Sequence, residues 1–204
     1  MKKYWRRLNN MYTLLLDSSN TSLAVGLAKD NVLLETIIYE AWQEQSEHMI
    51  PEIDKLLTKY QVKNEEILDV MVGIGPGSYT GVRIALTIAK TIAVALNVPV
   101  YPVSSLKILK SGNKPSICVI NARSNRSYIG VFEGEKTLVS DQIMTNDEVK
   151  QYIAEHPDYV VCGASSYLGI KGYISNVLEE MLSLKNFITP MKDSLWLKPV
   201  YLKD

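Results

Sequence analysis

Residues 72–84 read VGIGPGSYTGVRI, and this segment indicates the local fold on both sides of it. The short run 69–74 is typical of a buried strand, and residues 82–96 have the composition of a helix that is apolar on almost every side. Four of the 11 glycines in the chain lie between residues 73 and 81. Such crowding indicates a backbone that needs positive φ angles or a close approach to another segment. We therefore predict a buried strand, a glycine turn and a buried helix, in that order.

A glycine loop between a strand and a helix also suits a phosphate group, because helix N-termini present free N–H groups. The P-loop pattern is not met, since Thr80 stands where the second glycine is due and no lysine follows. The dinucleotide pattern fails at Ser78 or at Thr80, depending on the first glycine, and the GxSxG nucleophile elbow is absent. We interpret the loop as a tight turn that packs the strand against the helix, with a phosphate site as the alternative.

The N-terminal part of the chain reads as a meander followed by a helix. Strands are predicted at residues 12–16, 23–28 and 32–39, with a polar turn between the first two. Apolar residues then recur every three or four positions from about residue 46 to residue 60, which predicts an amphipathic helix. Its apolar face consists of Ile50, Ile53, Leu57 and Tyr60.

The second half of the chain repeats this order of elements. Strands are predicted at residues 117–121, 127–132 and 137–143, and Thr145 with Glu148 forms a capping-box signature that opens a helix to about Glu155. A strand at 159–162 precedes a last long helix. That helix is lined by Ile174, Val177, Leu178, Met181 and Leu182.

Two meander-and-helix units indicate a pseudo-duplicated α/β protein with two small subdomains. We expect the N-terminal subdomain at residues 11–104 and the C-terminal subdomain at residues 105–204. Residues 1–10 read as a disordered leader or tag outside the fold, because a strand pattern begins directly at Met11.

Charge and hydropathy limit the classes of partner. The chain has 22 basic and 22 acidic residues, but four of the basic ones lie in the first ten positions, where there is no acid. From Met11 onward 18 basic residues stand against 22 acidic ones, so a nucleic-acid role would need a partner's charge. The longest apolar run is interrupted by Arg83, Lys90 and Thr91, and no signal peptide is evident. We expect a cytoplasmic protein that does not enter a membrane.

The side chains suited to catalysis are few and scattered. His48 and His156 each lack a second metal ligand at helical or turn spacing, and Ser18 and Ser19 follow Asp17 without a base nearby in sequence. The two cysteines, Cys118 and Cys162, lie far apart in apolar stretches and read as core residues. We predict no catalytic, cofactor-binding or metal-binding residue.

Taken together, several segments resemble the bacterial TsaB (YeaZ) family. They are the LLLDSS start at residues 14–19, the Ser46-Glu47-His48 opening of the first helix, the glycine run, the Asn121-Ala122-Arg123 turn and the closing residues 199–203. The residues matching the family's motif loops are Asp17, Ser18, Gly75, Pro76, Gly77, Ser78, Tyr79, Thr80, Gly81, Arg83 and Arg123.

The resemblance implies the fold of the actin, sugar-kinase and heat-shock ATPase superfamily, with the second subdomain reduced. It implies a non-catalytic partner of the active paralogue TsaD that works with the ATPase TsaE on threonylcarbamoyladenosine in tRNAs reading codons that start with A. The chain would contact tRNA only through that complex and pair with itself when alone. Ser19 replaces the glycine of the superfamily's phosphate loop and Asn121 replaces an acidic residue, which implies a degenerate nucleotide site and no cofactor.

The resemblance also implies binding through the two long helices. The predicted interface consists of His48, Ile50, Ile53, Leu57, Ala85, Ile88 and Ile92. For Ala85 and Ile88, burial in the core of their own subdomain is the alternative. Two other functions stay open: an autonomous nucleotide-binding phosphotransferase of the same superfamily, and a homodimeric interaction protein of another purpose.

Overall fold

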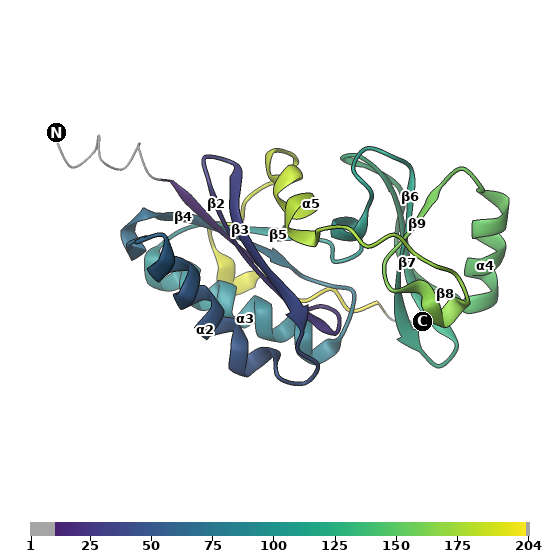
Figure 1. The fold of residues 1–204 in the computed structure, drawn as a ribbon, viewed down its shortest axis with the longest axis horizontal. Coiled ribbons are helices and arrows are strands. Elements are labelled where there is room, and N and C mark those ends of the chain that lie inside the picture. Colours follow the sequence, from purple (N-terminus) through teal and green to yellow (C-terminus); the bar gives the residue numbers. More distant parts are fainter. Residues whose placement is uncertain (1–10, 203–204) are drawn as a thin grey trace.

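A computed structural model describes residues 11–202. The predicted leader at residues 1–10 and the last two residues lie outside the described residues. The described chain forms two sheets that lie side by side along the long axis of the molecule, each accompanied by helices (Figure 1).

The first sheet has five strands: β1 (Tyr12–Asp17), β2 (Ser22–Lys29), β3 (Val32–Glu40), β4 (Ile67–Gly73) and β5 (Val100–Val103). They lie in the order β3-β2-β1-β4-β5. The meander β1-β2-β3 is antiparallel, whereas β4 and β5 add to β1 in parallel. Parallel neighbours require a crossover connection, and the long helices provide it. Strands β1 and β4 lie at the centre, and their side chains are almost all buried.

One face of this sheet is covered by α2 (Gln45–Lys59) and α3 (Tyr79–Leu96) (Figure 1). Met49, Ile53 and Leu56 of α2 and Ala85 and Ala89 of α3 are buried there in the main core. By length and composition α3 could cross a membrane, which is weak evidence because core helices pass the same test. Only the sheet side of α3 packs in the core and its outer side is exposed, so the predicted burial of the whole helix is wrong.

The second sheet has the order β8-β7-β6-β9. Its strands are β6 (Ser116–Arg123), β7 (Arg126–Glu133), β8 (Lys136–Thr145) and β9 (Val160–Cys162). An antiparallel meander is again extended by one parallel strand. The helix α4 (Asn146–Glu155) begins with the predicted capping box, in which Thr145 and Glu148 bond each other's backbone N–H groups. Cys118 and Cys162 are both buried free cysteines in this sheet.

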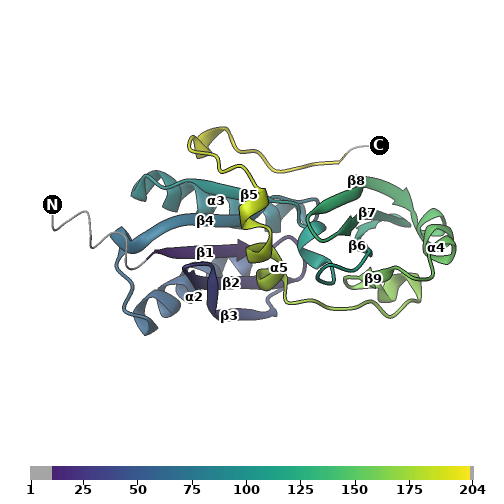
Figure 2. The ribbon, with the colours of Figure 1, turned by 90° about the horizontal axis from the view of Figure 1, so that it is seen from above.

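The chain does not stay in the second subdomain to its end. The last helix, α5 (Val177–Ser183), packs on the second face of the first sheet, with Leu178 and Met181 buried against Leu15 and Met71 (Figure 2). It has seven residues, so the long helix expected from Ile174 onward is wrong.

Beyond α5, residues 191–202 form a strap along the first subdomain. Met191 exchanges both backbone hydrogen bonds with Val100 of β5, and the Val200 N–H donates to the Ile74 carbonyl at 2.7 Å. The residues from α5 onward are therefore part of the first subdomain, which corrects the predicted assignment of residues 105–204 to the second. The correction arises because these segments bury apolar side chains on a sheet that is distant in sequence.

Candidate functional site

The glycine run packs against the turn that follows β1. The Ser78 N–H donates to the Ser19 carbonyl at 2.7 Å, and the Ser18 hydroxyl donates to the Gly81 carbonyl at 2.7 Å. A Cβ on Gly77 would lie 2.3 Å from the Ser19 carbonyl oxygen, a distance that real Cβ atoms do not adopt. Glycine is thus required here so that two backbone segments can touch.

The N-terminus of α3 is occupied by the protein's own groups. The Ser78 side chain caps the helix by accepting from the Gly81 N–H at 3.3 Å, while the carbonyl of Ser19 takes the Ser78 N–H. The Gly75 N–H donates to the Ser105 hydroxyl at 2.9 Å. These contacts use the N–H groups of Gly75, Ser78 and Gly81, three of the groups with which such a loop could hold a phosphate, and they support the interpretation as a packed turn.

Asp17 is buried at the centre of this arrangement. Its carboxylate accepts hydrogen bonds from the Ser19 N–H at 3.2 Å and from the Ser19 hydroxyl at 3.0 Å, and the Ser105 hydroxyl lies 3.4 Å away. Burial raises the pKa of Asp17 to about 6, against which these hydrogen bonds act weakly. A Cβ on Gly73 would lie 1.9 Å from its Oδ1, so no substrate group reaches the carboxylate from that side. The arrangement suits a structural carboxylate.

The turn between β6 and β7 holds the other motif residue. Arg123, Ser124 and Asn125 all have positive φ angles, and Asn121 Oδ1 accepts from the Arg123 N–H at 2.8 Å. Arg123 is exposed. The Asn121 amide therefore shapes the hairpin turn.

Neither histidine joins a catalytic cluster. His48 lies 3.6 Å from Glu44 and edge-on to Tyr39, and His156 stacks on Tyr152 at a ring distance of 4.1 Å. Within residues 11–202, no group of three or more histidine, cysteine, aspartate or glutamate side chains could hold a metal ion.

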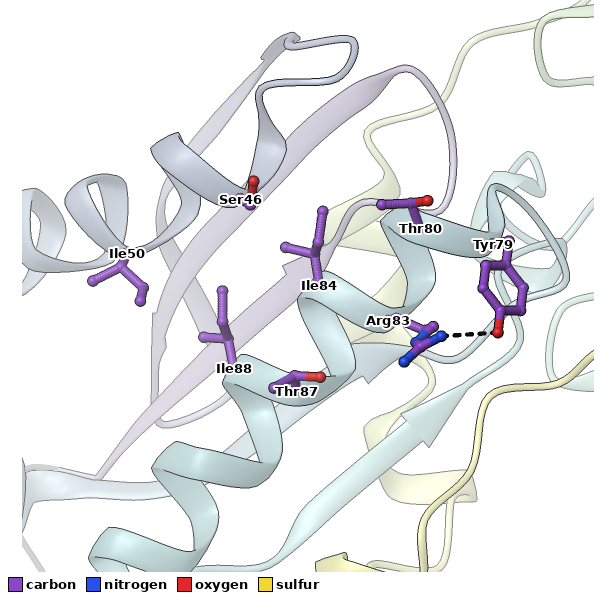
Figure 3. Close-up of a pocket in the computed structure, with 8 residues that line it drawn as sticks. All are labelled: Ser46, Ile50, Tyr79, Thr80, Arg83, Ile84, Thr87 and Ile88. Carbon is purple, nitrogen blue, oxygen red and sulfur yellow. Dashed lines mark hydrogen bonds between the residues drawn. The ribbon is translucent and has the colours of Figure 1, made fainter.

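A groove of about 400 Å³ lies between α2 and α3 (Figure 3). The side chains of Ile50 on α2 and of Ile84 and Ile88 on α3 extend into the gap between the helices. At one end, Arg83 Nη1 donates to the Tyr79 hydroxyl at 2.8 Å, and Tyr79 stacks on Tyr201 of the strap at a ring distance of 4.9 Å. The remaining lining residues are Ser46, Thr80 and Thr87.

The groove contains only part of the predicted interface. Ile50 is exposed and Ile88 is half-buried, and both line the groove. Leu57 and Ile92 are half-buried against the core. Ile53 and Ala85 are buried in the protein's own core, so their prediction as partner contacts is wrong.

His48 and the motif residues also differ from their predicted places. His48 lies on the β3 side of α2, against Tyr39, and not in the groove. Tyr79, Thr80 and Arg83 were predicted as residues of a motif loop, but they line the groove. Ile84 also lines the groove but is absent from the predicted interface, although its four-residue spacing places it in the same row of α3 as Ile88 and Ile92.

Comparison with known proteins identifies the family. A family model described as TsaD, tRNA N6-adenosine threonylcarbamoyltransferase, matches residues 39–158. The tRNA threonylcarbamoyladenosine biosynthesis protein TsaB of Bacillus subtilis is 28% identical over 187 residues, which are 87% of this chain and 80% of that protein. The chain belongs to the TsaB (YeaZ) family.

Other TsaB-family members agree with this assignment. TsaB of Escherichia coli is 28% identical over 142 residues, which are 62% of this chain and 61% of that protein. The structure of YeaZ from Pseudomonas aeruginosa superposes with a TM-score of 0.77 at 23% identity, and covers 94% of this chain and all of that one. The predicted actin-like α/β fold with two small subdomains is thereby confirmed.

Proposed function

We propose that this chain is a non-catalytic scaffold subunit of a cytoplasmic complex that forms threonylcarbamoyladenosine next to the anticodon of tRNAs reading codons that start with A. Its partners are a TsaD-like catalytic paralogue and a TsaE-like ATPase. The names of the TsaB relatives in Bacillus subtilis and Escherichia coli, which place those proteins in tRNA threonylcarbamoyladenosine biosynthesis, support the pathway.

The groove between α2 and α3 is the main observation that supports the scaffold role. Ile50 is 60% exposed, although it lies beside the half-buried isoleucines of α3. Covering an exposed apolar residue beside a groove stabilises the complex with the partner that covers it. Helix pairs also form largely apolar interfaces. The groove therefore supports docking of a helical partner on α2 and α3.

The packed turn supports a role without catalysis. The carbonyls of Ser18 and Ser19 lie against Gly81 and Gly77, where a nucleotide-binding relative needs open backbone N–H groups. Asp17 bonds to Ser19 and Ser105, so its carboxylate is engaged within the protein. With this turn closed and the Asp17 carboxylate engaged, the chain contributes through contact with a partner that performs the reaction.

The charge balance supports contact with tRNA through the complex. The 18 basic and 22 acidic residues from Met11 onward give a net charge of −4, with histidine neutral. Binding to a phosphate backbone depends on neutralising several phosphates with lysine or arginine. The basic surface for tRNA would then come from the partner subunits.

A reconstitution that leaves out one component tests the proposal. Labelled threonine, bicarbonate, ATP, cognate tRNA and the other purified components are combined with and without this chain. We expect label in tRNA only when the chain is present. Equal incorporation without it would refute the scaffold role, and magnesium-dependent ATP binding by the chain alone would then favour the phosphotransferase alternative.

A variant pair links the activity to the groove. Ile50→Asp places a charge on the exposed side of α2 and should abolish both binding of the TsaD-like paralogue and incorporation, without changing the thermal midpoint. Ile174→Asp is the matched control, because Ile174 is 70% exposed and lies outside the groove. Equal activity of the two variants would show that the groove is not needed for incorporation of label into tRNA.

A further inference from the structure

Two large apolar side chains of the strap, Leu195 and Trp196, are 67% and 73% exposed. They belong to a short 3-10 turn, Ser194–Trp196, whose backbone is firmly held. Lys90 Nζ of α3 donates to the carbonyls of Leu195 at 2.9 Å and of Leu197 at 3.1 Å. Asp193 Oδ1 accepts from the Leu195 N–H, and Ser194 and Leu197 on either side are buried. The protein thus presents two apolar side chains to solvent on a fixed backbone.

The turn lies beside the solvent side of α3. Lys90, which holds it, is one helical turn from Val94, and Val94 is 57% exposed. Although α3 is apolar enough to span a membrane, only 33% of it is buried. The outer side of α3 lies between the α2–α3 groove on one flank and the strap turn on the other. We call this area the α3 surface; its apolar members are Ile50, Ile88, Val94, Leu195 and Trp196, and the exposed Thr87 and Thr91 lie between Ile88 and Val94 on the helix.

The two edges of the α3 surface carry opposite charges. On α2, Glu47 and Asp54 lie three residues before and four residues after Ile50, so they flank it on the same helix face, and both are exposed. The strap carries the exposed Lys192 and Lys198 and one exposed acid, Asp193, whose carboxylate accepts from the Leu195 N–H, and the 18 residues of α3 include no acid. A partner that fits has an apolar centre, a basic edge over α2 and an acidic edge over the strap.

We propose that Leu195 and Trp196 are a second anchor for the protein partner whose helices dock in the α2–α3 groove. This inference rests on the proposed function, in which that partner is the TsaD-like paralogue. Exposed tryptophans on a rigid backbone are frequent energetic centres of interfaces, because they bury a large area at a small entropic cost. The acidic edge on α2 disfavours the anionic surface of a membrane as the occupant.

Binding of the purified paralogue to full-length variants tests the second anchor. We expect Trp196→Ala to raise the dissociation constant at least tenfold, with Leu195→Ala smaller in the same direction. Phe187→Ala is the matched control, because Phe187 is 65% exposed and follows α5 on the opposite side of the first sheet. It should leave the dissociation constant within twofold. An unchanged thermal midpoint for each variant establishes that the fold is kept.

A spectroscopic measurement follows Trp196 directly. The chain is labelled with 5-fluorotryptophan, and the Trp196 resonance is assigned by its loss in Trp196→Phe. Addition of unlabelled paralogue should shift or broaden this resonance. If paralogue binds while Trp196→Ala keeps wild-type affinity and the resonance stays unchanged, the second anchor is refuted and the groove proposal stands.

The remaining outcomes distinguish the paralogue from two other candidates for covering the α3 surface, a second copy of this chain and a membrane. If Ile50→Asp and Trp196→Ala weaken only self-association of this chain, a second copy covers the surface and our assignment of the partner is wrong. If Trp196→Ala reduces only binding to anionic vesicles, the occupant is a membrane. Failure of the wild-type chain to bind the paralogue would overturn the proposed function and the second anchor together.

Discussion

A Cβ atom on Gly81 would lie 1.8 Å from the carbonyl oxygen of Ser18. These two residues are 63 positions apart, and the Ser18 hydroxyl donates to the Gly81 carbonyl as well. The first turn of α3 is therefore pressed onto the turn after β1. This contact explains why the chain has glycine inside a helix, where that residue normally weakens the structure.

Gly81→Ala should destabilise the protein. Helix propensity alone predicts a gain of about 1 kcal/mol, whereas overpacking a close backbone contact costs about 1–3 kcal/mol or more. The sign of the change in unfolding free energy, measured by urea titration, separates the two effects. Thr87→Ala, at an exposed position of the same helix, is the control and should change stability little. Stabilisation by Gly81→Ala would contradict the contact.

Asp17 should make stability depend on pH. Its pKa is about 6 in the folded protein and 3.8 in its ordinary state, so folding favours the protonated carboxyl. The favourable contribution of the protonated Asp17 to the free energy of unfolding is fully present below pH 3.8. It is lost as the pH rises through about 6, and the total loss is about 3 kcal/mol. The difference in unfolding free energy between the protein and Asp17→Asn, measured from pH 4 to pH 7.5, should follow this curve. A difference that stays constant with pH would show that Asp17 ionises normally.

Lys185 should be needed to attach the segment after α5. Its Nζ lies 2.8 Å from Asp69 Oδ2 and donates to the Thr13 hydroxyl at 2.7 Å, and both charged side chains are nearly buried. Lys185→Met would leave the Asp69 carboxylate buried without its ion-pair partner, which costs about 3–5 kcal/mol. The double variant with Asp69→Leu should recover most of this loss in thermal unfolding. A double variant as unstable as Lys185→Met would show that packing of the lysine stem is the larger effect.

Ile50 and Ile53 should differ sharply despite their neighbouring positions on α2. Ile53→Ala empties a buried site and should cost about 2–5 kcal/mol of stability, whereas Ile50→Ala should change it by about 0.5 kcal/mol or less. Paralogue binding should show the reverse order, with the larger loss for Ile50→Ala. Equal effects on stability would mean that α2 does not pack as described. Denaturant titration and a binding titration on the same preparations provide both measurements.

The meander, the capped helix at Thr145 and the strand, turn and helix around the glycine run could all be predicted from the sequence. Each depends on neighbouring residues: alternation in a strand, the hydrogen bonds of Thr145 and Glu148, and the backbone freedom of glycine. Family membership also followed from several short motifs, of which the glycine run is the most specific. The site was predicted only in part, because Ile50 and Ile53 belong to one apolar pattern and differ in what packs against them.

The sequence by itself therefore determined the order of the elements, the α/β class and the close-packed glycine turn. Only the tertiary structure decided that Ile53 and Ala85 are internal, that α5 returns to the first sheet, and that the strap presents Trp196 beside α3. The spacing of apolar residues along a helix or strand shows which residues share one side of it, because that spacing follows from the local backbone geometry. Which neighbour covers that side depends on contacts between segments far apart in the chain, such as Lys90 with Leu195 and Ser18 with Gly81.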